Sequence, residues 1–159
     1  MENNRHPHLD ALDLKILKIL QHEGALSVAE VAGRVHQSTT TCWRRIQQLE
    51  QQRVIKGRVA LLDRAALGLD VTILAHVKLA TTGRDAIAKF EEAIRDRSEV
   101  LECYTLTGEW DFLLKIVTKN IKSFEAFYLD YLSRIPFVQS VNSSVAVTVI
   151  KESTALPLG

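Results

Sequence analysis

The chain has 159 residues, of which 47% are apolar and 25% are charged, and its formal net charge is +1. The length fits one domain or two small ones, and the apolar content excludes a disordered chain. The low net charge excludes a long-range electrostatic attraction of the whole molecule to nucleic acid or to a membrane. The apolar runs are too short to span a membrane, the first ten residues lack a signal-like stretch, and two cysteines exclude a disulfide framework. We therefore expect a cytoplasmic protein that does not bind membranes.

The mean charge conceals a difference between the two halves of the chain. Through residue 66 there are ten basic and seven acidic residues, whereas the remainder has ten basic and twelve acidic residues. Six of the basic residues fall between Arg34 and Arg58, where Glu50 is the single acid. Such a run is more often a solvated helix face than a binding site, so its meaning depends on the local pattern.

The first half is predicted to form three short helices. Apolar residues recur at helical spacing over residues 9–20, and again over 28–35 and 39–52. Each helix follows a residue whose side chain can accept hydrogen bonds from free backbone N–H groups, namely Asp10, Ser27 and Ser38. The tight connection over 36–38, between a short second helix and the third, is typical of a helix-turn-helix.

The third of these helices has one apolar side and one polar side. On a helical wheel, Cys42, Ile46 and Leu49 face the core. The opposite side carries Arg44 and neutral polar residues, which are Thr40, Gln47, Gln48 and Gln51. Arg and Gln side chains pair with guanine and adenine in the major groove, and free N–H groups at a helix start bind phosphate. We therefore expect Arg44 and Gln48 to contact bases. The remaining expected DNA contacts, mostly to phosphates, are Ser38, Thr39, Thr40, Arg45 and Lys56.

The second half changes to the two-residue period of strands. Residues 58–62 alternate like a short strand and are expected to form a wing or a hinge, and 63–70 resemble a linker. Strands are then predicted at 71–79, 100–107, 110–118 and 138–150. Helices are predicted at 85–97 and in a segment that is capped by Ser123 and ends before Pro136. This order is βαββαβ. The predicted fold class is therefore α+β, with a winged helix-turn-helix domain over 1–62 and a ferredoxin-like domain over 71–159.

The sheet of this second domain is predicted to have one face without helices. Both helices cover the same face, and the other would expose threonine, serine and some apolar side chains. The simplest partner for such a face is a second copy of the same sheet, which predicts a symmetric homodimer.

Three stretches of the chain together resemble the leucine-responsive regulatory protein and asparagine-synthetase-regulator (Lrp/AsnC) family of bacterial and archaeal transcription factors. They are LDALDLKILKILQHEGALSVAEVAGRV, STTTCWRRIQQLEQQRVIKG and TGEWDFLLKI, in the order and spacing of the family, and the likeness covers residues 9–156. It implies a helix-turn-helix that binds double-stranded DNA, a C-terminal domain that binds small effectors, usually amino acids, and dimers that often form octamers. The chain departs from the family in having no proline over 38–42, and in having His36 where glycine is frequent.

The resemblance also implies where an effector binds. Members bind effectors at the loop between two central strands, with help from the last strand. The matching positions here are Thr105, Thr107, Gly108, Trp110, Asp111, Ser144, Val145 and Ala146. Gly108 lets the backbone approach a ligand closely, and the Asp111 carboxylate can accept from an α-ammonium group. From spacing alone, a tight hairpin in which Asp111 pairs with Lys115 explains these residues slightly better than an effector site does. The resemblance to the family makes the effector site the favoured interpretation.

Catalytic and metal-binding interpretations are weaker. Cys103, His76 and Asp111 could be a nucleophile, its base and an orienting carboxylate. The first two fall on different strands, however, and a buried structural thiol explains Cys103 better. His6 and His8 have no further ligand at metal-binding spacing. No phosphate loop, dinucleotide fingerprint or zinc motif is present, so we expect no cofactor and no metal.

Each of the two tryptophans admits two interpretations. Trp43 lies beside the polar side of the third helix and either packs against the domain edge, which we favour, or contacts the sugar or backbone of DNA. Trp110 follows the turn at Gly108 and is either a packed residue or the wall of a ligand pocket, since aromatic residues line most such pockets.

The leading hypothesis is a sequence-specific DNA-binding transcriptional regulator that responds to a small effector, by the resemblance an amino acid, and that is not an enzyme. Its expected partners are double-stranded DNA, the effector and further copies of the chain, up to an octamer. The alternative is a ferredoxin-like metabolic enzyme or a stand-alone amino-acid-binding module. An enzyme has no need for an acid-poor helix with an Arg/Gln face after a tight turn, so this helix favours the regulator.

Overall fold

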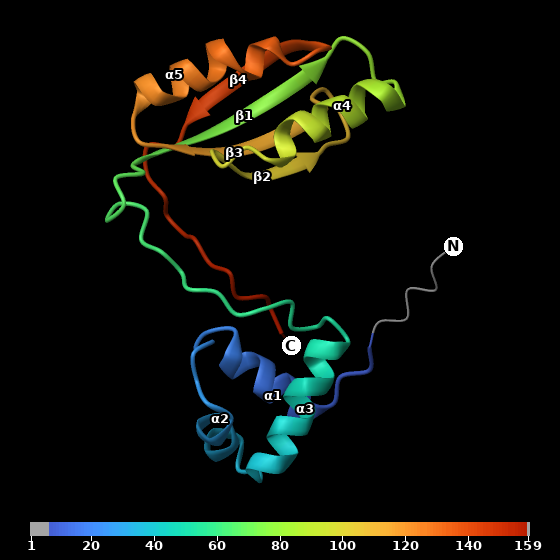
Figure 1. Ribbon diagram of the computed structural model, residues 1–159, viewed down its shortest axis with the longest axis vertical. Helices are drawn as coiled ribbons and strands as arrows, with labels where there is room; N and C mark the ends of the chain where they lie inside the picture. Colours follow the sequence, from blue (N-terminus) through green and yellow to red (C-terminus); the bar gives the residue numbers. More distant parts are fainter. Residues whose placement is uncertain (1–6, 159) are drawn as a thin grey trace. The chain divides into compact units, whose positions relative to one another are not determined.

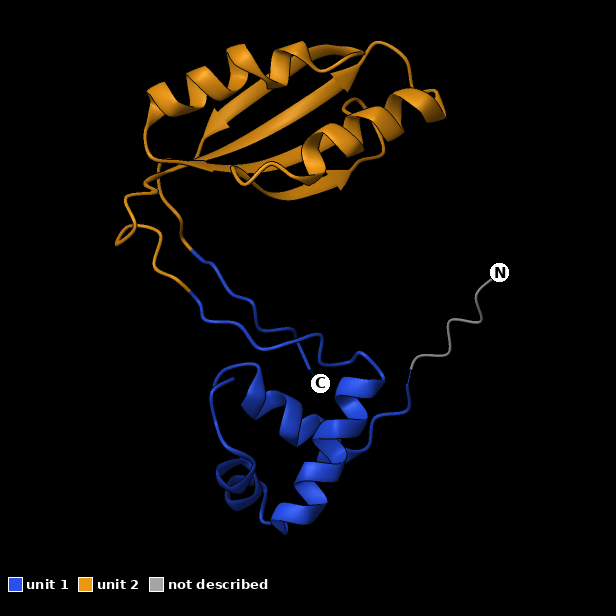
Figure 2. Cartoon of the chain, viewed as in Figure 1, with its two compact units in different colours: residues 1–61, 151–159 blue, residues 62–150 orange. Residues whose placement is uncertain are grey.

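The structure is a computed structural model that describes residues 7–158, and it divides the chain into two compact units (Figure 1, Figure 2). Unit 1 comprises residues 1–61 and 151–159, and unit 2 comprises residues 62–150. The domain expected over 71–159 differs from unit 2 at its end, because the last residues of the chain belong to unit 1. No helix within the described residues has the length and the apolar character that crossing a membrane requires.

The helices of unit 1 begin where polar side chains satisfy free backbone N–H groups. In the described residues these helices are α1 (Ala11–Leu20), α2 (Val28–Val35) and α3 (Thr39–Gln51). Asp10 and Ser27 each form a capping box, in which the carboxylates of Asp13 and Glu30 accept from the cap N–H. The hydroxyl of Ser38 accepts from a backbone N–H three residues later, at 3.2 Å. The three predicted caps are confirmed.

These helices pack around an apolar core of their own. Its members come from the inward sides of all three helices, and they are Ile16, Leu17, Leu20, Val31, Ala32, Val35, Cys42, Ile46 and Leu49. Cys42, Ile46 and Leu49 confirm the predicted inward side of α3. Full burial of one aliphatic side chain contributes about 1.5–3 kcal/mol. The core therefore fixes which side of α3 faces outward.

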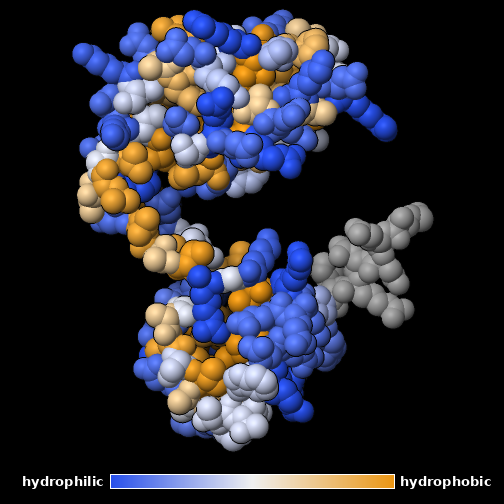
Figure 3. Space-filling view, viewed as in Figure 1, coloured by the Kyte–Doolittle hydropathy of each residue, from blue (hydrophilic) through white to orange (hydrophobic). Residues whose placement is uncertain are grey.

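The segment that follows α3 does not form the expected wing. Residues 56–63 contain no strand, and Val59, Leu61 and Leu62 are 84%, 75% and 71% exposed. A strand needs partners for its backbone N–H and C=O groups, and no other strand exists in the described residues of unit 1. The alternating apolar residues over 58–62 therefore belong to an extended connecting segment (Figure 1), and their apolar side chains are exposed (Figure 3).

The C-terminal segment packs on unit 1. The Gln21 Nε2 donates to the C=O of Leu156 at 3.3 Å, and the N–H of Leu156 donates to Gln21 Oε1 at 3.0 Å. Leu158 packs against the apolar core of the unit. One amide side chain thus binds both backbone groups of an extended residue. These contacts explain why residues 151–159 leave the sheet domain.

Deleting residues 153–159 is expected to lower the free energy of unfolding of unit 1 by about 1–2 kcal/mol, because two hydrogen bonds and the packing of Leu158 are lost. The chain has two tryptophans, so in a Trp110→Phe background the fluorescence of Trp43 reports on unit 1. Pro157→Ala, at an exposed position, is the control and should change stability by less than about 0.5 kcal/mol. An unchanged urea midpoint in the deletion variant would contradict the packing.

Unit 2 holds a four-stranded antiparallel sheet. Its elements in chain order are β1 (Val71–Leu79), α4 (Arg84–Arg95), β2 (Val100–Thr105), β3 (Phe112–Thr118), α5 (Ile121–Asp130), the short 3-10 helix η1 (Leu132–Arg134) and β4 (Val138–Val145). The strand order is β2-β3-β1-β4, so β1 and β3 are central. This is the ferredoxin-like arrangement that the βαββαβ order predicts, and the α+β fold class is confirmed.

The two faces of the sheet differ in what covers them. Helices α4 and α5 lie on one face (Figure 1), where alternate residues of the central strands are buried. These residues are Ile73, Ala75, Val77, Leu79, Phe112, Leu114 and Ile116. The other face carries no helix of the described residues and exposes polar groups together with Leu74 and Tyr104, which are 39% and 51% exposed. The expectation of one open, mixed face is confirmed.

Several predicted details of unit 2 are wrong. The strands expected at 100–107 and 110–118 are shorter, because β2 ends at Thr105 and β3 begins at Phe112. The last strand ends at Val145 and not at residue 150, because the N–H of Ala146, bonded to the C=O of Thr72 at 2.9 Å, makes the last ladder contact with β1. Helix α5 is capped by Asn120, whose Oδ1 accepts from the N–H of Ser123 at 2.9 Å. Ser123 lies in the first turn and not at the cap.

Candidate DNA-binding face and effector site

The outward side of α3 exposes the two predicted base-reading residues. Arg44 and Gln48 are exposed, and no hydrogen bond or ion pair ties either side chain to the rest of the described chain. Gln47 is half-buried, and its Nε2 donates to Glu50 Oε2 at 3.1 Å. Residues four apart are neighbours on a helix surface. An unpaired guanidinium and an unpaired amide therefore lie side by side, and each can form the paired hydrogen bonds that a base edge offers.

The start of α3 has a polar surface that suits phosphate. Thr39 and Thr40 are exposed, whereas the Ser38 hydroxyl is used in the cap and bonds to Thr41 Oγ1 at 2.8 Å. The first backbone N–H groups of a helix have no partner inside it, and the helix dipole favours an anion there. Lys56, beyond the end of α3, is also exposed and forms no ion pair within residues 7–158.

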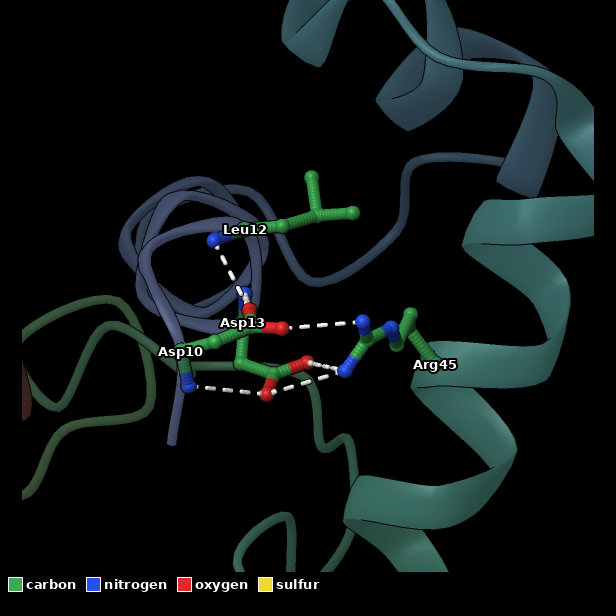
Figure 4. Close-up of polar contacts among 4 residues, drawn as sticks. All are labelled: Asp10, Leu12, Asp13 and Arg45. Atoms are coloured by element: carbon green, nitrogen blue, oxygen red, sulfur yellow. Dashed lines mark hydrogen bonds and ion pairs between the residues drawn. The ribbon is translucent and has the colours of Figure 1, made fainter. Parts of the chain in front are cut away.

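Arg45 is engaged inside unit 1 and is not presented on the outward side. Its Nη2 lies 2.8 Å from Asp10 Oδ2, and its Nη1 lies 3.4 Å from Asp13 Oδ2, so two carboxylates at the start of α1 hold the guanidinium (Figure 4). The side chain is 26% exposed, and its Nε is buried without a hydrogen-bond partner among the described residues. The expected phosphate contact of Arg45 is therefore at odds with this geometry, in which Arg45 links α3 to α1.

The Asp10 carboxylate serves both the helix cap and this link. Its Oδ1 accepts from the N–H groups of Leu12 and Asp13, each at 2.9 Å, while Oδ2 faces Arg45 (Figure 4). The hydrogen bond from the Asp13 backbone and the charge of Arg45 hold the pKa of Asp10 below its ordinary value of 3.8, against the opposing effect of desolvation. The sequence indicated Asp10 as a cap, but the link to Arg45 depends on how α1 packs against α3.

The turn before α3 has the backbone conformation that glycine favours. His36 has φ 53° and ψ 49°, in the left-handed region, and its N–H donates to carbonyls in the last turn of α2. Histidine tolerates this region better than most residues with a side chain. The departure from glycine at His36 therefore keeps the geometry of the turn.

The predicted effector loop lies at one end of the sheet. Residues 106–111 connect β2 to β3 and are closed by the N–H of Leu106, which donates to the C=O of Asp111 at 2.8 Å. Gly108 has φ 121°, a conformation that side chains rarely adopt. Trp110 is half-buried, and its ring centroid lies 5.8 Å from that of His76 on the open face of the sheet. Trp110 is thus a partly covered aromatic surface beside the loop.

Asp111 is the most constrained residue of this loop. Its Oδ2 accepts from the N–H of Leu79 at 2.8 Å, and its Oδ1 lies 3.3 Å from Lys78 Nζ. On this edge of β1, β3 begins at Phe112, opposite Val77, so Leu79 has no ladder partner in β3 and the Asp111 carboxylate accepts in its place. The alternative pair with Lys115 is wrong, because Lys115 Nζ lies 3.2 Å from Glu102.

The last-strand residues implied in the effector site lie at the opposite end of the sheet. Ser144 is opposite Leu74, whereas Asp111 binds the N–H of Leu79, five residues further along β1. At about 3.3 Å per residue, the two groups are about 17 Å apart along the strand. Thr105, Thr107, Gly108 and Trp110 therefore lie with Asp111. Within one chain, Ser144, Val145 and Ala146 do not.

The structure gives no support to a catalytic thiol. Cys103 is exposed, so the expectation of a buried thiol is wrong. It is opposite Leu114 in the sheet and faces the helices, whereas His76 faces the open side. Partial desolvation and the nearby Glu91 carboxylate raise the pKa of the Cys103 thiol, which disfavours the thiolate. Among residues 7–158, no three His, Cys, Asp or Glu side chains are placed to hold a metal ion, and His6 lies outside these residues.

Each of the two units matches a known protein family. The AsnC-type helix-turn-helix domain matches residues 9–50, which include all of α1 and α2 and nearly all of α3. The Lrp/AsnC ligand binding domain matches residues 72–156 and so covers all of the sheet except Val71, the first residue of β1.

Individual proteins are similar over nearly the full chain. The glutamate uptake regulatory protein of Zymomonas mobilis is 36% identical over 150 residues, which cover 94% of this chain and 91% of that protein. The DNA-binding transcriptional activator DecR of Escherichia coli is 33% identical over 150 residues, covering 94% and 99%. The crystal structure of a transcriptional regulator from Neisseria meningitidis in complex with L-Met matches with a TM-score of 0.91 and 36% identity, covering 95% and 97%.

Proposed function

Because the chain belongs to the Lrp/AsnC family, we propose that it binds double-stranded DNA as a dimer through α3, and that an amino acid modulates this binding. The broad class of activity follows from the family itself. The chain is a DNA-binding transcriptional regulator and not an enzyme, since its relatives are regulators and activators of transcription. The observation that carries the DNA-binding proposal is the outward side of α3, where Arg44 and Gln48 have no partner within the described chain.

A dimer supplies the second copy of α3 that DNA recognition needs. One helix-turn-helix makes few contacts, and two copies bind half-sites about 34 Å apart on one side of the duplex. The open face of the sheet supports the pairing, because it exposes Leu74 and Tyr104 and carries no helix of residues 7–158. A symmetric dimer would cover this face with a second copy of itself.

We assign the effector site to Thr105 and the loop over 106–111, together with Ser144, Val145 and Ala146 from a neighbouring subunit. Within a single chain, the loop and the last-strand residues are about 17 Å apart along the strand, so they cannot both contact one bound amino acid. A carboxylate has about four acceptor positions, so Asp111 can bind Leu79 and Lys78 and still accept from an α-ammonium group. The relative from Neisseria meningitidis was solved with L-Met, which supports an amino acid as the ligand class.

A site shared between subunits also requires an assembly, for which we propose an octamer of four dimers. In light scattering at micromolar concentration, we expect a mass that is a multiple of 17.9 kDa, at least that of a dimer. The monomer mass would contradict both the dimer and the shared site.

Arg44→Ala is expected to weaken binding to a tight-binding duplex by about 1–3 kcal/mol and to relax base preference at one position. The reason is that a guanidinium forms two hydrogen bonds to a guanine edge that alanine cannot replace. Competitive binding with duplexes mutated one base pair at a time measures both effects. Arg95→Ala, an exposed arginine at the end of α4, is the matched control. Unchanged affinity and base preference in Arg44→Ala would show that another part of α3 reads the bases.

A further inference from the structure

Trp43 is an apolar side chain exposed beside the outward side of α3. It is 56% exposed, so the packing that the sequence favours accounts for less than half of the indole. Its neighbours are Val28 at the start of α2, and Thr39 and Thr40 at the start of α3, and together they line a shallow hollow of about 250 Å³. Aromatic side chains dominate the energetics of interfaces, so a partner that covers this indole gains affinity.

The position of Trp43 joins this hollow to the proposed DNA-binding face. Trp43 lies three residues after Thr40 and four before Gln47, so the three side chains are neighbours along one strip of α3. Arg44 and Gln48, which are both exposed, directly follow Trp43 and Gln47 and so extend the same surface around the helix. A duplex bound by Arg44 and Gln48 would therefore pass close to the hollow.

The hollow lies between the first turns of the two helices of the helix-turn-helix. In this motif the second helix enters the major groove while the first crosses the sugar-phosphate backbone. The lining of indole, isopropyl and threonine methyl groups suits the apolar surface of a sugar and offers no cation to a phosphate. We propose that Trp43 packs against a deoxyribose of the DNA backbone. This contact rests on the proposed DNA-binding function, and it adds affinity without reading sequence.

The test uses the full chain, a duplex selected for tight binding and a random duplex of the same length. Trp43→Ala is expected to weaken binding to both duplexes by a similar factor, roughly five- to tenfold for the loss of one aromatic contact. Trp43→Phe should keep most of the affinity, because a phenyl ring still covers the sugar. Neither variant should change the slope of log K against log salt, because the contact neutralises no phosphate.

Fluorescence supplies a second readout that a purely structural role would not change. In a Trp110→Phe background the emission comes from Trp43 alone, since the chain has two tryptophans. Binding of either duplex should shift this emission to shorter wavelength as the indole leaves water. Unchanged emission, or unchanged affinity of a folded Trp43→Ala variant, would overturn the proposal. If Trp43→Ala does not fold, the affinity of Trp43→Phe and the emission of Trp43 still test the proposed contact.

Two further results separate the alternatives. If replacing thymine by uracil weakens binding of the wild type but not of Trp43→Ala, the indole contacts a base methyl group, and the deoxyribose contact is wrong. If the wild-type chain binds neither duplex, the proposed DNA-binding function fails as a whole. Failure of the Trp43 contact alone leaves wild-type binding intact.

Discussion

Replacing Arg45 by methionine is expected to lower the free energy of unfolding of unit 1 by about 2–3 kcal/mol. The substitution keeps an unbranched side chain but removes the cation that faces Asp10 and Asp13. Asp13 is 5% exposed, so its carboxylate would stay out of water without a compensating charge. Removing one partner of a buried ion pair costs about 3–5 kcal/mol, and the partial exposure of Arg45 places the expected cost below that range. Urea unfolding followed by Trp43 fluorescence measures the change.

The salt dependence of DNA binding separates the two possible roles of Arg45. Removing a cation that contacts phosphate reduces the salt slope by about 1, whereas removing a cation that links α1 to α3 leaves the slope unchanged. We therefore expect Arg45→Met to weaken binding with the slope of the wild type. Lys56→Met, at an exposed position, should reduce the slope and change stability by less than about 0.5 kcal/mol. A reduced slope in Arg45→Met would restore the phosphate contact that the sequence indicated.

The outward side of α3 could be predicted from the sequence because it depends on local rules. Ser38 fixes where the helix begins, and the spacing of Cys42, Ile46 and Leu49 fixes which side is buried. The positions of Arg44 and Gln48 then follow from helical geometry alone. The role of Arg45 does not follow, because its carboxylate partners lie more than thirty residues away in the chain and meet it only when α1 packs on α3.

The effector site shows the same division between local and distant information. The turn at Gly108 is local, and its position between the second and third strands was predicted. The expectation that both of these strands are central is wrong, because β2 lies at the edge of the sheet. Leu79, whose N–H binds Asp111, could not be found from spacing, because the start of β3 at Phe112, opposite Val77, determines which backbone group of β1 lacks a ladder partner. The alternation that continues past Val145 gave too long a last strand, because a strand ends where its neighbour ends, whatever side chains follow.

Asp111→Ala is expected to destabilise unit 2 by about 2–3 kcal/mol and to remove the response to an amino acid. Leu79 is 2% exposed, and its N–H loses the Asp111 carboxylate as acceptor. A buried donor left without a partner costs about 1–3 kcal/mol, and the contact with Lys78 is lost as well. Loss of effector binding in this variant would therefore have two explanations, a disturbed loop or a missing ligand for the α-ammonium group.

Asp111→Asn separates these explanations. The amide oxygen can still accept from the N–H of Leu79, so the loop should keep its conformation with a loss of stability under about 1 kcal/mol, while the charge that attracts an ammonium group is gone. Calorimetry would use the amino acid that most raises the Tm of the wild type among the twenty common ones. Glu109→Gln, an exposed carboxylate in the same loop, is the matched control and should bind as the wild type does. If Asp111→Asn binds the amino acid as tightly as the wild type, the carboxylate holds the loop only, and the α-ammonium group is bound elsewhere.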